Sequence, residues 1–150
     1  PYRSMLIELF NQGFQKEVWL FFGTPYSTDL MYDDEFRYLA DLHPNFNYVT
    51  AISREQKNEL GGRMYVQDRL IEYSEQLLPL LSQQTTLMYL CGLKGMEFGI
   101  YPWLYRINSN LVNLPKGMSD QDIQSLPASA KEWSQVERAR DKDRLFKETY

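Results

Sequence analysis

Ser53, Arg54 and Arg63 are the residues whose types and spacing best suit binding of a phosphate group. Ser53 and Arg54 directly follow an apolar run that ends at Ile52, and Arg63 and Tyr65 come after a short polar loop. Guanidinium and hydroxyl groups donate charge-assisted hydrogen bonds to a phosphate monoester, and a tyrosine ring can stack on a base. Together these residues predict a site for the 2′-phosphate and adenine of NADP.

An alternative interpretation of this loop is that its charges are only solvated surface on an acidic protein. Composition alone favours that interpretation, because charged loops are usually exposed. The type of nucleotide is a separate question. An acidic residue that holds the ribose 2′-hydroxyl would have indicated NAD, whereas Ser53 and Arg54 stand at the strand end, with Glu55 the nearest acid.

A second segment, residues 89–97 (YLCGLKGME), runs from an apolar stretch into a thiol, a glycine and an expected helix start. Gly92 lets the backbone approach a ligand, and the amide groups at a helix start favour anions. Cys91 lacks a histidine or metal partner, and buried cysteines are commonly small apolar core residues. The spacing therefore predicts a ligand-facing strand end rather than a catalytic thiolate, and no metal site is expected.

The only histidine, His43, is followed by Pro44 at an expected helix end. Proline blocks continuation of a helix, so His43 stands where the helix stops. We interpret it as a surface or capping residue and not as a general base.

The elements that position these residues alternate between buried strands and amphipathic helices. This order predicts an α/β fold with a doubly wound parallel sheet, in which ligands bind outside the carboxyl ends of the strands. Functional residues are therefore expected just after positions 22, 52 and 90. The expected elements are a helix from residue 1, a strand at 18–22, a helix at 33–43, a strand at 48–52, a helix at 67–81 and a strand at 87–90.

The part of the chain after residue 95 has a weaker pattern. A helix over residues 96–110 is expected despite Pro102, followed by a polar loop over 112–127. A charged helix is expected from about residue 129 to 147, leaving the three residues 148–150 as the end of the chain.

Composition indicates one soluble globular domain that spans residues 1–150. Of the 150 residues, 43% are hydrophobic and 24% are charged, which is enough apolar material for one core. A net charge of -4 argues against a nucleic-acid surface, and no apolar stretch is long enough to span a membrane. A single cysteine fits a reducing compartment. The start at Pro1, without an initiator methionine, suggests that a segment upstream is missing.

Several of these segments together resemble the nucleotide domain of plant-type ferredoxin–NADP reductases. SREQ at residues 53–56, RMYVQ at 63–67, CGLKGME at 91–97 and ETY at 148–150 carry the likeness. PYRS at residues 1–4 resembles the second half of that family's glycine-rich pyrophosphate segment, and FFGTP at 21–25 resembles the end of its second strand. The resemblance runs through residues 1 to about 100 and resumes at the last three.

This resemblance implies site residues only where the motif residues are present. The positions that bind the 2′-phosphate and adenosine are matched by Ser53, Arg54, Arg63 and Tyr65, with Gln67 nearby. The positions that line the nucleotide path are matched by Gly23, Thr24, Pro25, Gly92 and Leu93. The pair that surrounds the nicotinamide is matched by Cys91 and Glu148, and the terminal aromatic that covers the flavin ring is matched by Tyr150.

The resemblance also implies an activity. The intact protein is expected to transfer hydride between NADPH and FAD, and to exchange single electrons with a ferredoxin or another iron–sulfur protein or domain. An FAD-binding domain is expected upstream and is absent from this chain, which should be inactive alone. Location is expected to be cytoplasmic, with peripheral membrane association if the protein is photosynthetic.

Residues 100–130 depart from the photosynthetic enzymes. YPWLY at residues 101–105 and the long loop after it resemble, at least as well, reductase components that serve an oxygenase, such as that of the benzoyl-CoA epoxidase system. The electron partner therefore stays open between a ferredoxin and an oxygenase component.

Two rival functions remain. A diflavin reductase fragment usually ends in tryptophan or continues beyond it, and Tyr150 as the last residue argues against that class. A noncatalytic NADPH-sensing module is the other rival, although a sensor requires none of Cys91, Glu148 and Tyr150. A flavin spectrum of the full-length protein would separate the sensor from the enzyme.

Overall fold

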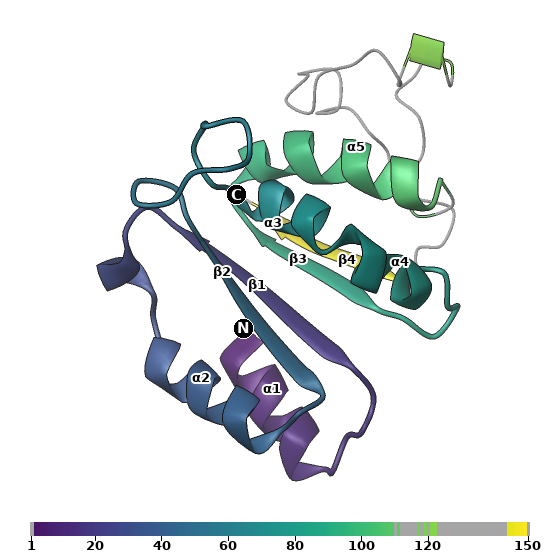
Figure 1. Cartoon of the computed structure of the whole chain (residues 1–150). Helices are drawn as coiled ribbons and strands as arrows, with labels where there is room; N and C mark the ends of the chain where they lie inside the picture. Colours follow the sequence, from purple (N-terminus) through teal and green to yellow (C-terminus); the bar gives the residue numbers. More distant parts are fainter. Residues whose placement is uncertain are drawn as a thin grey trace. The chain divides into compact units, whose positions relative to one another are not determined.

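The structure, a computed structural model, describes residues 2–109, 111, 117, 119, 121–122 and 144–149, with only the backbone at 94, 148 and 149. It divides into two compact units, residues 1–69 (unit 1) and 70–150 (unit 2). Figure 1 shows the helices and strands of both, and each unit is described by itself.

Unit 1 is built around two parallel strands. Residue by residue, β1 and β2 pair from Val18 opposite Phe46 to Thr24 opposite Ile52. Both strands consequently end at the same edge, which is where the loops of interest begin. The elements are α1 (Tyr2–Asn11), β1 (Val18–Thr24), the 3-10 turn η1 (Ser27–Asp29), α2 (Asp33–Leu42), β2 (Phe46–Ile52) and the first residues of α3 (Val66–Glu72).

The core of unit 1 lies between its two helices and one face of the strand pair. Leu6 and Phe10 of α1 and Phe36 of α2 pack with Leu20 of β1 and Phe46 of β2. Figure 1 shows α1 and α2 next to each other beside these strands. Because the apolar faces of both helices meet the same sheet face, they fix the two strands as one body.

A polar cluster supports the start of α2. The carboxylate of Asp33 accepts hydrogen bonds from Arg37 Nε at 2.8 Å and from the hydroxyl of Tyr48 at 2.9 Å. Desolvation raises the pKa of Asp33, but these hydrogen bonds and the charge of Arg37 outweigh it, so the pKa lies below its usual range. Tyr48 is in β2, so this cluster ties the helix to the sheet.

Unit 2 contains a second parallel pair. β3 and β4 pair from Met88 opposite Leu145 to Gly92 opposite Thr149. Buried side chains from α4, β3, α5 and β4, among them Leu77, Leu90, Leu104 and Leu145, form its core. The elements are α4 (Ser74–Leu81), β3 (Met88–Gly92), the 3-10 turn η2 (Lys94–Met96), α5 (Glu97–Ile107) and β4 (Leu145–Thr149).

The predicted α/β class with parallel strands is confirmed, and six of the expected elements are present with shifts at their ends. The single helix expected over residues 67–81 is wrong, because α3 ends at Glu72 and α4 begins at Ser74. The Ser74 hydroxyl donates to the carbonyl of Leu70 at 3.0 Å, four residues back. Such a bond competes with the backbone ladder and bends helices.

The charged helix expected up to residue 147 is also wrong over its last residues, which form β4. Residues 129–143 of that expectation, and most of the loop expected over 112–127, lie outside the described residues. Arg144 explains why the strand forms: its guanidinium donates to the carbonyls of Thr86 at 3.0 Å and Leu81 at 2.9 Å. This buried anchor aligns the segment with β3, so long-range pairing overrides local composition.

Within the described residues, no helix is both long enough and apolar enough to cross a membrane.

The core of unit 1 can be tested at Phe36, which is 3% exposed and packs against Tyr48 with ring centroids 5.3 Å apart. Phe36→Ala removes a buried ring, so the free energy of unfolding should fall by about 3–5 kcal/mol. Tyr38→Ala in the same helix is the control, because Tyr38 is 62% exposed. Urea unfolding of both variants checks this, and equal losses would contradict the described core.

Candidate functional site

The site in unit 1 begins where the ends of β1 and β2 are joined by backbone hydrogen bonds. The amide of Ser53 donates to the carbonyl of Thr24 at 2.9 Å, and the amide of Arg54 donates to that of Pro25 at 2.9 Å. These bonds extend the strand register into the two loops. Four residues predicted for the site therefore share one rigid edge.

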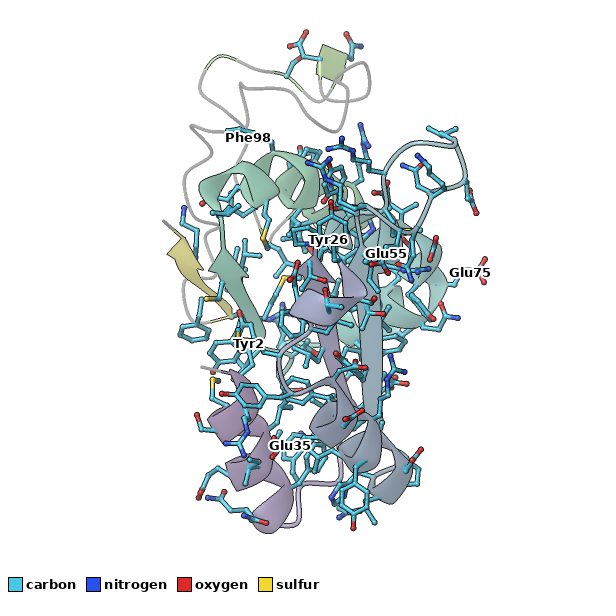
Figure 2. All side chains as sticks on the ribbon, turned by 90° about the vertical axis from the view of Figure 1, so that its left-hand side faces the viewer. Tyr2, Tyr26, Glu35, Glu55, Glu75 and Phe98 are labelled. Atoms are coloured by element: carbon cyan, nitrogen blue, oxygen red, sulfur yellow. The ribbon has the colours of Figure 1, made fainter. Side chains whose placement is uncertain are left out.

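Glu55 also fixes this edge, because its carboxylate accepts hydrogen bonds from the loop after β1. One oxygen accepts hydrogen bonds from the Ser27 amide at 3.0 Å and the Ser27 hydroxyl at 3.2 Å. Figure 2 shows Glu55 beside Tyr26, the residue before Ser27. The acid nearest to Arg54 in sequence thus binds the loop after β1 through this oxygen.

Arg69 has a structural role although it is a third arginine near the site. Its Nε donates to the carbonyl of Thr50 at 2.9 Å, and its Nη2 donates to Gln56 Oε1 at 3.1 Å. The same oxygen of Gln56 accepts the amide of Ile52 at 2.9 Å. Arg69 therefore secures the turn that follows β2.

Arg54 and Arg63 differ from Arg69 because their side chains are exposed. No hydrogen bond or ion pair joins either guanidinium to another residue in the described part of the chain. Met64, 3% exposed, donates its amide to the carbonyl of Gln56 at 3.3 Å, which places the segment around Arg63 alongside residues 53–56. Two cationic groups thus stand at one edge with their donors available to a ligand.

Tyr65 follows Met64 and is 43% exposed, as a ring that stacks on a base must be. Its carbonyl accepts the amides of Asp68 at 3.0 Å and Arg69 at 3.3 Å, so it caps the start of α3. Gln67 is half-buried in the first turn of the same helix. Unit 1 thus brings together all eight of its predicted site residues at the end of β1, on the loops and at the helix start along this edge.

Gly23 lets α3 approach the end of β1 closely. A β-carbon at this position would lie 2.7 Å from Cγ2 of Val66, the first residue of α3. Real β-carbons do not come so near, so a side chain at Gly23 would force the Val66 side chain or α3 to shift. The glycine is required by packing, independently of any nucleotide.

In unit 2, β3 and β4 place Cys91 and Glu148 opposite each other as partners in the parallel register. Cys91 is a half-buried thiol. Gly92 has a φ of +150°, and a β-carbon there would lie 2.5 Å from the sulfur of Met96. Leu93, the next predicted site residue, is exposed.

A partly buried ion pair lies beside this register. Glu97, at the start of α5, is 2% exposed, and its Oε2 accepts a hydrogen bond from Lys147 Nζ at 3.1 Å. The same ammonium lies 5.9 Å from the centre of the Tyr101 ring. Lys147 precedes Glu148, so the pair fixes β4 next to the position predicted to face the nicotinamide.

Four residues that hold the site in the structure were not predicted from the sequence to do so: Glu55, Asn58, Asp68 and Lys147. The sequence signal for Asp68 is its acidic side chain in the first turn of an expected helix, where acidic residues are enriched. Tyr150 lies outside the described residues.

His43 is the C-terminal cap of α2, and its amide donates a hydrogen bond to the Leu39 carbonyl at 2.9 Å. Its ring stacks on that of Phe10, with ring centroids 4.2 Å apart. This position agrees with the predicted capping role.

Comparison with known proteins gives a consistent result. A family model described as an oxidoreductase NAD-binding domain matches residues 1–100. The chloroplastic ferredoxin–NADP reductase, leaf isozyme 1, of Arabidopsis thaliana is 45% identical over 106 residues, covering 67% of this chain and 29% of that protein. The ferredoxin–NADP reductase of Spirulina sp is also 45% identical, covering 67% of this chain and 36% of that protein.

A solved structure extends the likeness to the fold. The ferredoxin–NADP+ reductase from Plasmodium falciparum superposes with a TM-score of 0.63 at 20% identity, covering 100% of this chain and 48% of that one. At this identity the match concerns the fold alone. The chain spans about a third of the length of the curated relatives that it matches.

The close approach at Gly23 gives a test with a built-in rescue. Gly23→Ala should lower the free energy of unfolding by about 1–3 kcal/mol, because the added methyl group meets Val66. Val66→Ala removes the opposing methyl groups, so Gly23→Ala should cost much less in that background. A thermal or urea double-mutant cycle measures the difference, and an identical cost in both backgrounds would contradict the described contact.

Proposed function

We propose a function on the premise that this chain belongs to the oxidoreductase NAD-binding domain family, as a nucleotide domain of the ferredoxin–NADP reductase type. The chain binds NADP(H) as part of a flavoprotein oxidoreductase. The observation that carries this proposal is the pair of exposed guanidiniums, Arg54 and Arg63, with the exposed ring of Tyr65 on the same edge of unit 1.

The residues of unit 1 fit the adenosine end of NADP. Arg54 and Arg63 supply charge for a 2′-phosphate, and the Ser53 hydroxyl supplies a further donor. Tyr65 offers a ring face for the adenine, with Gln67 near it. Glu55, whose Oε1 is bonded to Ser27, is proposed to hold the loop after β1 and not the ribose. In this proposal Gly23, Thr24 and Pro25 line the nucleotide path.

Unit 2 is proposed to act at the nicotinamide end. Gly92 and Leu93 line the path, while Cys91 and Glu148, partners in the β3–β4 register, flank the nicotinamide ring. Cys91 shapes that pocket, and Glu148 offers a hydrogen bond near the reacting carbon. Tyr150, which follows β4 in the sequence, is proposed to cover the flavin ring until the nicotinamide displaces it.

The flavin supplies the redox chemistry when bound, accepting or returning hydride and exchanging single electrons with a ferredoxin-type iron–sulfur centre. Its binding domain is proposed to lie upstream, since the relatives are about three times as long as this chain. On this proposal the 150-residue chain by itself does not oxidise NADPH at an enzymatic rate. The full-length protein is proposed to carry a bound flavin, which would exclude a noncatalytic sensor, and to be cytoplasmic.

The electron partner is proposed to be a ferredoxin or a related iron–sulfur domain, as the names of the relatives suggest. The alternative, an oxygenase component, rests on the sequence at residues 101–105. Tyr101, Pro102, Trp103 and Leu104 are buried in α5, where they serve the core of unit 2. That segment thus has a packing role and gives no support for an oxygenase partner.

Arg54→Glu in the full-length protein tests the proposed nucleotide site. A charge-assisted hydrogen bond is worth about 1.5–3 kcal/mol, so the preference for NADPH over NADH in kcat/KM should fall by about one to two powers of ten. Lys16→Glu is the control: it makes the same change of charge at an exposed residue before the other end of β1. If the preference is unchanged in Arg54→Glu, residues 53–54 are ordinary surface and the proposal fails.

A further inference from the structure

The loop that leads to Arg63 is closed around one side chain, Asn58. Asn58 Oδ1 accepts hydrogen bonds from the amides of Gly62 at 2.8 Å and Leu60 at 3.2 Å. The Asn58 backbone amide donates to the carbonyl of Gly62 at 3.0 Å, and Gly61 turns the chain with a φ of +76°. An exposed, glycine-rich loop thereby acquires a defined shape, although Leu60 at its tip is 95% exposed.

The amide nitrogen of the same side chain connects this loop to α3. Asn58 Nδ2 donates to Asp68 Oδ1 at 3.0 Å. The second oxygen, Asp68 Oδ2, accepts the backbone amide of Tyr65 at 2.8 Å. Asp68 is the third residue of α3 and Tyr65 its cap, so this is the return bond of a capping box. Both oxygens of one carboxylate are thus committed to fixing the chain near Tyr65.

These bonds act on both sides of the buried residue Met64. On one side, the carbonyl of Arg63 accepts a long hydrogen bond of 3.4 Å from Asn58 Nδ2. On the other, Asp68 holds the amide of Tyr65. Met64 itself points into the core, which leaves Arg63 and Tyr65 exposed next to it. The backbone of the two exposed residues is therefore set before any ligand arrives.

We propose that Asn58 and Asp68 are positioning residues for nucleotide recognition. They hold Arg63 and Tyr65 in the arrangement that binds a 2′-phosphate and an adenine ring, without touching the ligand themselves. This proposal rests on the proposed NADP(H) function. Ordering a flexible loop on binding opposes association, so a loop that is ordered beforehand binds more tightly. The gain in affinity applies to the 2′-phosphate, the ligand group that Arg63 is proposed to contact. Asn58 and Asp68 would therefore determine selectivity for nucleotides that carry this phosphate.

A purely structural role would have a different consequence. If the Asn58–Asp68 bond only stabilised the fold, its loss would lower stability and leave the relative affinity for two adenine nucleotides unchanged. The discriminating probes are adenosine 2′,5′-bisphosphate and AMP, which differ in the 2′-phosphate. The measured quantity is the ratio of their dissociation constants, obtained by calorimetry on the full-length protein.

Asn58→Ala should lower the selectivity for the bisphosphate by about three- to tenfold, the effect of one to two lost hydrogen bonds. Leu60→Ala is the matched control in the same loop, because the Leu60 side chain is solvent-exposed, and it should leave the ratio unchanged. If Asn58→Ala leaves the ratio at the original value, the proposal is overturned. A ratio near one in the unaltered protein would instead contradict the proposed function itself.

Exchange of the residue types at positions 58 and 68 distinguishes a lost positioning role from simple misfolding of a variant. Asn58→Asp alone sets two carboxylates against each other and should lower the ratio further than Asn58→Ala. Adding Asp68→Asn restores the donor between positions 58 and 68, keeps acceptors for the amides of Gly62 and Tyr65, and should recover most of the selectivity. A double variant that is no more selective than Asn58→Asp alone would overturn the proposed positioning role.

A double-mutant cycle with Arg63→Ala tests whether Asn58 acts through Arg63. In an Arg63→Ala background the side chain that Asn58 is proposed to position is gone. Asn58→Ala should then change the ratio of dissociation constants by less than about twofold, within the scatter expected for independent effects. An effect as large as in the presence of Arg63 would show that Asn58 does not work through that arginine.

Discussion

The site in unit 1 depends on the parallel register of β1 and β2, which ends both strands at one edge. Two bonds between backbone groups, from the amides of Ser53 and Arg54 to the carbonyls of Thr24 and Pro25, carry this register into the loops. Main-chain bonds of this kind do not depend on side-chain rotamers, so the arginine is placed by the fold itself. The apolar core beneath the strands, centred on Phe36, in turn keeps the register in place.

On this edge the charged residues divide into two groups with different tasks. One group forms hydrogen bonds to neighbouring backbone and side chains and so fixes the shape of the loops; it consists of Glu55, Asp68 and Arg69. Arg54 and Arg63 have no such bonds in the described part of the chain and remain available. An acidic protein can therefore present a local cationic site, because two of the nearby carboxylates, those of Glu55 and Asp68, accept hydrogen bonds from other groups.

Sequence patterns predicted the α/β class, the first three strands and the edge at which the proposed site residues of unit 1 lie, because buried strands and amphipathic helices have strong periodicities. They did not predict β4, because its charged residues resemble those of an exposed helix. The strand forms through its pairing with β3 and the hydrogen bonds of the buried Arg144. The break before Ser74 was also missed, since it arises from a side-chain bond inside a good helical pattern. Residue type and spacing indicated Ser53, Arg54, Arg63 and Tyr65 and the strand end at 91–92, and resemblance to a family added the other site residues. Neither indicated Asn58 or Asp68, because their role exists only in three-dimensional contacts.

The central claim is that the edge formed by the loops after β1 and β2 binds the 2′-phosphate end of NADP(H). A crystal structure of the full-length protein with NADP+ bound tests it most directly. The account predicts phosphate oxygens within about 3 Å, hydrogen-bond distance, of the Arg54 and Arg63 guanidiniums and the Ser53 hydroxyl, with the adenine stacked on Tyr65. A nucleotide bound elsewhere, or one whose 2′-phosphate contacts neither arginine, would contradict it.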